Sequence, residues 1–361
     1  MRILVVTPWF PTAESAASGV FVQREVEALA ARHEVTVLHL DWQRGAALDP
    51  SSLGGYGYRH VPLFRANPLA YRAARRIVAE FAQSHDVTHT HALTGLVPWL
   101  VGRPGGERPW VHSEHWSGIT APETLRATDR LALRVLGRRL RSADAVIAES
   151  SRLAKGIRRF RASPVDVVPC VVDTVTPVER PRGPALRLVA VGSLIARKGP
   201  ILAVDALAEL VSRGVPAELT WVGDGPLAAA VSERAREMDV DDRLRLAGAL
   251  DAAGVMQELQ AASLFVLPTQ GDNFCVVVAE ALVNGRPVVS GAATGAVDYA
   301  APAVSRFVER QTGAAYADAV EDLARATASL GAAEIAATVA GRFDRVRVAD
   351  ELSRIYLRVA G

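Results

Sequence analysis

The fold of this chain is decided by the stretch SLFVLPTQGDNFCVVVAEALVNG, residues 263–285. It starts as a short apolar run typical of a buried strand, passes through a polar turn, and continues as an apolar helix that Gly285 ends. In an α/β protein this order places backbone N–H groups of a helix N-terminus where they bind phosphate. Asp272 in the turn and Glu280 in the helix add a carboxylate at each end. A ligand that carries both phosphates and hydroxyls, such as a nucleoside diphosphate, would explain the free N–H groups at the turn and the buried carboxylate in the helix.

Strand and helix patterns alternate on both sides of this stretch, which predicts an α/β fold with mostly parallel sheets. In open sheets of this kind, ligands bind beyond the carboxyl ends of the strands. In the first half we expect strands at 3–7, 34–39, 87–90, 110–113 and 145–148, and helices at 21–32, 70–84 and 123–141. In the second half we expect strands at 186–191, 218–222, 243–246, 264–267 and 287–290, and helices at 200–213, 226–238, 274–284 and 346–359.

The length of 361 residues exceeds the usual size of one hydrophobic core, so two domains are expected. A stretch rich in proline and glycine, residues 176–184, separates the two series of strands. We therefore expect Rossmann-like, doubly wound domains at 1–175 and 186–345. The final segment, 346–361, is expected to be a helix that packs back toward the N-terminal domain.

The composition, with half of the residues hydrophobic and 22% charged, is typical of a globular protein. The first residues lack the long apolar region and the small-residue cleavage site of a signal peptide. The apolar stretch 92–102 is about half of the roughly 20 residues that span a bilayer. Two cysteines, Cys170 and Cys275, form no disulfide framework. We therefore expect a cytoplasmic protein.

Charge is distributed unevenly along the chain. Residues 1–185 contain 24 Lys and Arg against 17 Asp and Glu, a net +7, and residues 186–361 contain 17 against 22, a net −5. Within the expected helix 123–141, an arginine recurs every four residues. This stripe is either a solvated helix face, the commoner case, or a contact with an anionic acceptor or anionic lipid. Peripheral association with the inner membrane face is therefore the alternative location. The stripe consists of Arg126, Arg130, Arg134 and Arg138.

The loop GSLIARKGP, residues 192–200, follows the first expected strand of the second half and is a candidate phosphate site. Arg197 and Lys198 would stand beside the N-terminus of the next helix, where a diphosphate's charge could be met. Only two of the 41 basic residues are lysine, which draws attention to Lys198, although Lys155 is the other. The alternative is an ordinary loop with two exposed cations.

The turn WVGDGP, residues 221–226, is the second candidate loop. At Gly223 its backbone could approach a nucleobase or ribose closely. The commoner alternative is a plain turn in which Asp224 caps the next helix.

Histidine is scarce, with eight in the chain, yet four follow two expected strands of the first half. One such histidine alone is more often structural, but the group could orient a sugar hydroxyl or stabilise developing charge. The spacing does not suggest a zinc site, because no cysteine completes a ligand set. The four are His89, His91, His112 and His115.

These motifs, in this order, resemble the family 4 retaining glycosyltransferases, which have the GT-B architecture of two Rossmann-like domains facing a cleft. The family signature has two acidic residues with seven between them, in a phrase E-x-F-G-x-x-x-x-E-A followed by G-x-P-V-V. It corresponds to residues 272–281 and 285–289. The resemblance covers nearly the whole chain. Further matches are the turns at 198–199 and 223–226, EHWSG at 114–118, and VPCVVDT at 168–174.

The resemblance implies a role for each matching residue. Glu280 would bind the ribose hydroxyls, Asp272 the sugar of the donor near its C3 and C4 hydroxyls, and Lys198 the diphosphate. His115 would sit at the sugar near the reacting carbon. The candidate catalytic residues are thus His115, Lys198 and Asp272. The remaining donor-binding candidates are Gly19, Ser193, Arg197, Gly223, Asn273, Phe274 and Cys275.

The resemblance also implies transfer of a sugar, with retention of configuration, from a UDP- or GDP-sugar to a hydroxyl. The acceptor would be a glycan, a lipid-linked molecule or a natural product. No cofactor, metal or nucleic-acid partner is expected, since cations and backbone amides would hold the diphosphate. Alternatives are another GT-B enzyme, such as a nucleotide-sugar 2-epimerase or a phosphorylase, and a non-catalytic sugar-nucleotide-binding protein. A nicotinamide-dependent oxidoreductase is disfavoured, because the first strand leads into TPWFP, residues 7–11, and not into G-x-G-x-x-G.

Departures from the family pattern concern the donor pocket. Asp272 stands for the usual glutamate and is one methylene shorter. Ser193 stands where many members carry a phosphate-binding arginine, a part that Arg197 could take. Cys275 and Ala296 replace usual glycines, which would narrow the pocket.

Overall fold

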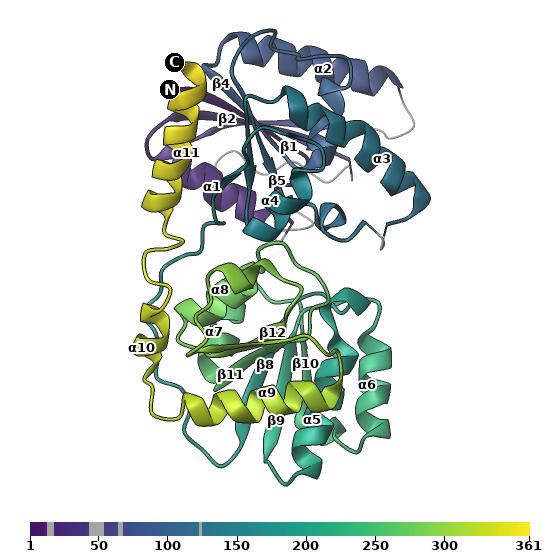
Figure 1. The fold of residues 1–361 in the computed structure, drawn as a ribbon, viewed down its shortest axis with the longest axis vertical. Coiled ribbons are helices and arrows are strands. Elements are labelled where there is room, and N and C mark those ends of the chain that lie inside the picture. Colours follow the sequence, from purple (N-terminus) through teal and green to yellow (C-terminus); the bar gives the residue numbers. More distant parts are fainter. Residues whose placement is uncertain (13–17, 43–53, 64–67, 123–124) are drawn as a thin grey trace. The chain divides into compact units, whose positions relative to one another are not determined.

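The computed structural model describes residues 1–12, 18–42, 54–63, 68–122 and 125–361. It divides into two compact units (Figure 1). Unit 1 comprises Met1–Val172 together with Phe343–Gly361, and unit 2 comprises Asp173–Arg342. The chain therefore leaves unit 1 once and returns to it for its last helix. From the sequence we expected an N-terminal domain ending at 175, a second domain at 186–345 and a final helix from 346.

Unit 1 is built on a seven-stranded parallel sheet of order β3-β2-β1-β4-β5-β6-β7. Its strands are β1 (Arg2–Thr7), β2 (Glu34–Asp41), β3 (Gly57–Pro62), β4 (Val87–His91), β5 (Trp110–Glu114), β6 (Ala145–Ala148) and β7 (Asp166–Val167). Its helices are α1 (Val20–Ala30), α2 (Pro68–Gln83), η2 (Leu93–Trp99), η3 (Ser117–Ile119), α3 (Ala127–Gly137), η5 (Arg138–Ser142), α4 (Ser151–Ile157) and α11 (Arg345–Ala360).

Both faces of this sheet are buried, because successive strand residues point to opposite sides. Ile3 and Val5 of β1 face the core formed with α1 and α11. Leu4 and Val6 face the core formed with α2, α3 and α4. Figure 1 shows α11 alongside α1, and the two helices are in contact. The C-terminal helix is therefore part of the core of unit 1.

Unit 2 is built on a six-stranded parallel sheet of order β10-β9-β8-β11-β12-β13. Its strands are β8 (Leu186–Val191), β9 (Ala217–Val222), β10 (Leu244–Gly248), β11 (Leu264–Leu267), β12 (Val288–Gly291) and β13 (Ser305–Val308). Its helices are η6 (Ala196–Lys198), α5 (Pro200–Ser212), α6 (Ala228–Glu237), η7 (Asp241–Arg243), α7 (Ala252–Ala261), α8 (Val276–Val283), η8 (Gly295–Asp298), α9 (Gly313–Ala326) and α10 (Ala332–Ala337).

The α/β fold class predicted from the alternation is confirmed, and every predicted strand is present within about two residues of its expected ends. The expected helix 123–141 is only partly right. The α-helix α3 begins at Ala127, ends at Gly137 and gives way to the 3-10 helix η5, while residues 123–124 lie outside the described part. The elements that the pattern missed are β3, β7, β13, α4, α7, α9 and α10.

Strand order reverses at one place in each sheet, between β1 and β4 in unit 1 and between β8 and β11 in unit 2. In doubly wound sheets the loops beyond such a switch point form the ligand site, because the connecting helices leave to opposite faces there. The loops after β8 and β11 carry the predicted phosphate site. In unit 1, β4 itself carries two of the predicted histidines: His89 lies within the strand beside Val5 of β1, and His91 is its last residue.

The arginine stripe lies along α3 and at its two ends. Arg126, Arg130, Arg134 and Arg138 are all exposed. Their exposure agrees with a solvated helix face. Contact of this face with lipid or an anionic acceptor stays a prediction. Within the part of the chain that the structure describes, every helix is too short or too polar to cross a bilayer.

Candidate active site

The loop between β8 and α5 is shaped by close backbone contacts. Gly199, which precedes α5, has a φ of +69°, and a Cβ added there would lie 2.2 Å from the carbonyl oxygen of Pro268. Only glycine allows both the left-handed backbone and this approach to the end of β11. The contact brings Lys198 against the turn that follows β11.

Three charged groups meet at this switch point, and we call them the Lys198 cluster: Arg197, Lys198 and Asp272. The Lys198 ammonium lies 2.5 Å from Oδ2 of Asp272, and Nη1 of Arg197 lies 3.7 Å from the same oxygen. The Lys198 and Asp272 side chains are only 14% and 20% exposed. Their mutual attraction is therefore less screened by water than that of a surface pair. The cluster has one cationic group in excess, which suits it to an anion.

Hydrogen bonds hold this cluster in place. The Arg197 guanidinium donates to the carbonyl oxygen of Gly271, and the amide of Gln270 donates to the carbonyl oxygen of Arg197 at 2.8 Å. The backbone amide of Asp272 donates to the carbonyl oxygen of Ala293 at 3.1 Å. The backbone carbonyl oxygen of Asp272 accepts from the amide of Gly295 at 3.0 Å. The loops after β8, β11 and β12 are thus tied together, including the loop 294–296, where Ala296 replaces a usual glycine of the family.

Helix α8 begins from an unusual backbone conformation at Cys275, whose φ and ψ are both 64°. For a residue other than glycine this left-handed conformation costs about 1–2 kcal/mol. The Tyr299 hydroxyl compensates by lying 3.1 Å from the carbonyl oxygen of Phe274 and 2.8 Å from that of Cys275. Helix α8 is therefore preceded by a left-handed residue that carries a buried thiol.

The Cys275 thiol should not react with thiol reagents in the folded protein. Its side chain is buried, and burial raises its pKa to about 12, with the nearby Asp272 carboxylate acting in the same direction. Since the thiolate is the nucleophile, almost none is present at pH 7–8. In a Cys170→Ser variant, which leaves Cys275 as the one cysteine, Ellman's reagent should give no signal until denaturant is added. Rapid reaction of the native variant would contradict this assignment.

The other predicted donor residues lie on the same strand ends of unit 2. Glu280 lies in α8 and is half-buried, Asn273 is buried in the turn, and Ser193 is exposed after β8. Gly223 packs against the backbone of Gly192, since a Cβ there would lie 2.2 Å from that residue's carbonyl oxygen. Arg197 therefore stands in the cluster whereas Ser193, which has the position of the family's arginine, contributes no charge.

The cap alternative for Asp224 is wrong. Helix α6 begins at Ala228 and its N-cap is Leu227. The Asp224 carboxylate instead accepts from the backbone amide of Gly225 at 2.6 Å. The backbone carbonyl oxygen of Asp224 accepts from the backbone amide of Leu194 at 2.9 Å. The turn therefore packs on the loop after β8.

In unit 1, His115 directly follows β5 and is held at both ring nitrogens. Its Nδ1 is hydrogen-bonded to the Glu149 carboxylate, and its Nε2 lies 3.0 Å from Nδ1 of His91. Burial lowers the pKa of His115, but the charge and hydrogen bond of Glu149, together with the charges of Glu25 and Glu114, outweigh this and the pKa is raised. The Cys170 thiol donates to Glu149 at 3.3 Å. His115 is therefore fixed in position, with a bias toward its charged form.

The expectation that the four histidines gather at strand ends is wrong for His112. It lies inside β5 on the opposite face of the sheet, where its Nδ1 is 2.8 Å from Thr90 Oγ1 and its Nε2 is 3.1 Å from Glu114. Strand alternation explains this, since His89 and His91 on β4 share a face that His112 on β5 does not. His89 also lies within its strand, buried, and contacts the hydroxyls of Tyr356 and Ser113.

Glu114 and Gly19 both contact the backbone of neighbouring loops. Glu114 is buried and accepts from the amides of His115 and Trp116, both at 2.8 Å. Burial alone would raise the pKa of Glu114, but its contacts with His112 hold the pKa low. Gly19 precedes α1 with a φ of +69°, and a Cβ there would lie 2.4 Å from the backbone of Trp9. Residues 13–17, which lie between the end of β1 and Gly19, are outside the described part.

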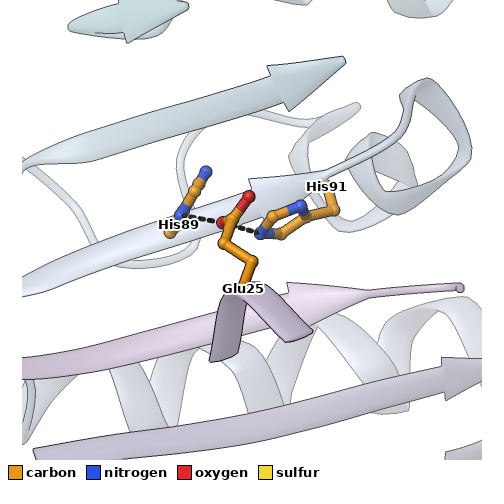
Figure 2. Close-up of side chains that lie close together, drawn as sticks. All are labelled: Glu25, His89 and His91. Atoms are coloured by element: carbon orange, nitrogen blue, oxygen red, sulfur yellow. Dashed lines mark ion pairs between the residues drawn. The ribbon is translucent and has the colours of Figure 1, made fainter. Parts of the chain in front are cut away.

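Glu25 is a site residue that the sequence pattern did not reveal. It lies on α1 with its carboxylate 3.5 Å from Nε2 of His91 and 3.7 Å from Nδ1 of His89 (Figure 2). Burial raises its pKa to about 7, although the charge of His115 lowers it. A signal was present in the sequence. Glu25 lies three residues after the buried Val22 and four before the buried Leu29, so helical spacing places it on the buried face of α1.

Comparison with known proteins identifies both halves of the chain. Residues 18–176 match the family model described as Glycosyltransferase Family 4, and residues 185–329 match Glycosyl transferases group 1. The D-inositol 3-phosphate glycosyltransferase of Corynebacterium aurimucosum is 29% identical over 309 residues, which cover 76% of this chain and 72% of that protein. The same enzyme of Segniliparus rotundus is 28% identical over 246 residues, and the match spans 61% of this chain but about half, 54%, of that protein.

The fold is also similar to solved structures. The crystal structure of Anabaena Alr3699/HepE in complex with UDP and glucose matches with a TM-score of 0.77 and 17% identity, covering 98% of both chains. At this identity the likeness concerns the fold, and it extends over both units. With both halves matched by glycosyltransferase models and the fold shared, the chain belongs to the family 4 glycosyltransferases and has the GT-B architecture.

Proposed function

We propose that this glycosyltransferase moves a sugar from a UDP- or GDP-sugar to an acceptor hydroxyl with retention of configuration. The observation that carries the proposal is the Lys198 cluster at the switch point between β8 and β11. A cationic cluster with a carboxylate, beside the N-termini of α5 and α8, has groups for both the diphosphate and the sugar of such a donor.

The cluster would act mainly on charge that develops in the transition state. As the bond to the sugar breaks, negative charge builds on the leaving diphosphate, and Lys198, Arg197 and helix N-termini would stabilise it. Groups fixed in advance, like these, often contribute more to catalysis than any other effect. Asp272, held by Lys198, would accept hydrogen bonds from sugar hydroxyls. No metal enters this scheme, since cations and amides meet the charge of the diphosphate.

Retention would follow from attack on the same face of the sugar that the diphosphate leaves. In that case the leaving diphosphate oxygen takes the proton of the acceptor hydroxyl, and no carboxylate nucleophile is required. His115, fixed by Glu149 and biased toward its charged form, is proposed to contact the sugar near the reacting carbon. The named activity of the inositol phosphate relatives supports a hydroxyl acceptor, and the UDP and glucose of the HepE structure support a nucleotide-sugar donor. The acceptor would be a glycan, a lipid-linked molecule or a natural product.

A thermal-shift screen with UDP, GDP, ADP, dTDP and their glucose or mannose conjugates tests the proposal. A nucleotide at 100 times its Kd should stabilise the folded chain by about 2.7 kcal/mol. The stabilising donor is then incubated alone and with candidate acceptors, and the products are separated. Formation of an epimeric sugar from the donor without an acceptor would identify an epimerase, whereas release of the unchanged sugar would be hydrolysis of the donor. Absence of any shift with UDP and GDP would contradict the proposal.

Replacing Glu280 by alanine should weaken binding of the nucleotide by about 10- to 100-fold, because hydrogen bonds to a carboxylate are worth about 1.5–3 kcal/mol. Glu280→Gln keeps the shape and one acceptor oxygen and should lose less. Calorimetric titration with UDP or GDP measures both Kd values, and Glu233→Ala on α6, an exposed glutamate, is the control. An unchanged Kd in Glu280→Ala would remove this residue from the ribose site.

A further inference from the structure

Three side chains of unit 1 converge on one point, and we call them the Glu25 triad: Glu25, His89 and His91. In Figure 2 the Glu25 carboxylate reaches from α1 to the two imidazoles on β4. One atom from each, Glu25 Oε1, His89 Nδ1 and His91 Nε2, lies within 4.8 Å of the other two. The two histidines are completely buried, so the three atoms face each other in a region shielded from solvent.

Two of these three atoms are unsatisfied. Glu25 Oε1 and His91 Nε2 are buried, and neither has a hydrogen-bond partner among the described residues. Leaving a buried polar atom unpaired costs about 1–3 kcal/mol, and more when it is charged. Two such atoms 3.5 Å apart, aimed at the same place, indicate that something binds between them.

We propose that the Glu25 triad binds a Zn²⁺ ion through Glu25 Oε1, His89 Nδ1 and His91 Nε2, with water as the fourth ligand. Two imidazoles and a carboxylate are a donor set that Zn²⁺ takes in open, four-coordinate sites. Bonds of about 2.0–2.1 Å in a tetrahedron place neighbouring ligand atoms roughly 3.3–3.4 Å apart. The separations of 3.5 and 3.7 Å between the Glu25 carboxylate and the two imidazoles therefore need only a few tenths of an ångström of contraction. The two histidine nitrogens, which lie within 4.8 Å of each other, would have to approach to the same spacing.

The groups around the triad already orient the imidazoles for metal binding. His89 Nε2 lies 2.8 Å from Ser113 Oγ, and His91 Nδ1 lies 3.0 Å from His115 Nε2. Metal-binding histidines usually donate their other ring N–H to a carboxylate, a backbone carbonyl or water, which fixes the tautomer. Here Ser113 Oγ and Nε2 of a neutral His115 would be the acceptors. Among the described residues, the Tyr356 hydroxyl, 2.7 Å from His89 Nδ1, is the group that the ion must displace. Leaving the buried Tyr356 hydroxyl without this hydrogen bond costs about 1–3 kcal/mol, so moderate affinity is expected.

Zinc was not expected from the spacing of the histidines, because no cysteine near them in sequence completes a ligand set. The third ligand instead comes from a helix that tertiary structure brings beside β4. The site lies within unit 1, whereas the Lys198 cluster belongs to unit 2, so the metal-free scheme for the diphosphate is unchanged. A bound ion would fix His91 with its Nδ1–H directed at Nε2 of His115, which accepts that hydrogen bond only as a neutral imidazole.

The test is a titration of the chelator-treated full chain with Zn²⁺ by calorimetry, and with Co²⁺ by visible absorption. Wild type should bind one equivalent, give the intense absorption of tetrahedral Co²⁺, and melt at a higher temperature with Zn²⁺. Glu25→Gln, which keeps the shape but removes the charge, should weaken binding at least 100-fold, since even a residue that only supports a ligand costs about 10- to 100-fold. Glu27→Gln, on the same helix but paired with Arg345, should bind like wild type.

Absence of a stoichiometric site, or equal binding by Glu25→Gln, would overturn the proposal. The unpaired atoms of Glu25 and His91 would then share a proton instead of a metal ion. The melting temperatures of the metal-free variants show whether each is folded. These readouts need no sugar transfer, so their failure would leave the proposed function standing, and failure of that function would leave the site standing.

Discussion

Replacing Lys198 by alanine lowers the kcat for sugar transfer by about 10²- to 10³-fold, the usual effect of removing one fixed group that stabilises developing negative charge. The ammonium of Lys198 is held 2.5 Å from Asp272 at the carboxyl ends of β8 and β11. It is therefore in place before the leaving diphosphate becomes charged, and alanine removes it without disturbing a core residue. Steady-state kinetics with the nucleotide-sugar found in the thermal-shift screen measure the loss.

The chain supplies its own control, because it has only one other lysine. Lys155 is exposed on α4 of unit 1, so Lys155→Ala removes the same charge and should transfer sugar at the wild-type rate. Lys198→Arg should recover only part of the activity, since a planar guanidinium does not occupy the position of a compact ammonium. Equal rates in Lys198→Ala and wild type would exclude Lys198 from the phosphate site.

Most of the fold could be predicted because its central strands are apolar runs bounded by polar turns. Strand β3 was missed because GYRHVP, at the sheet edge, alternates only weakly and ends in proline. Strand β7 has two residues, Asp166 and Val167, which is too short for any periodicity. Helix α3 was extended too far, because the pattern of arginines continues through the 3-10 turn η5. Hydrophobic periodicity therefore predicts the elements that form the core and misses those at its margins.

The candidate site was predicted less evenly. Local motifs suffice to predict that Lys198 and Asp272 lie close together, because the glycine-containing loops after neighbouring parallel strands lie at the same edge of the sheet. Their roles stay predictions, although the structure brings the two side chains into contact. Glu25 could not be paired with His89 and His91 from spacing alone, since the contact depends on how α1 packs on β4. His112 was grouped wrongly because the face of a strand residue depends on register, which the chain's spacing does not reveal.

Replacing Gly199 by alanine should reduce both stability and sugar transfer far more than the same change at Gly214. Both glycines have left-handed backbones, with φ of +69° and +76°, and they lie at opposite ends of α5. Alanine costs about 1–2 kcal/mol in that conformation at either position, partly offset by a less flexible unfolded chain. At Gly214 a Cβ meets nothing within 4 Å, so Gly214→Ala should cost about 1 kcal/mol of unfolding free energy and leave kcat unchanged.

At Gly199 the added Cβ would lie 2.2 Å from the carbonyl oxygen of Pro268, a backbone atom that cannot turn away. The loop after β8 must then separate from the end of β11, so we expect a total cost of about 3–5 kcal/mol. Lys198 moves with its neighbour, and a displacement of about 1 Å in a catalytic group can cost roughly 10²-fold in rate. Urea unfolding measures the first effect, and kcat at a temperature where both variants are folded measures the second. If the two variants lost the same stability and rate, the close packing of these loops would not be what positions Lys198.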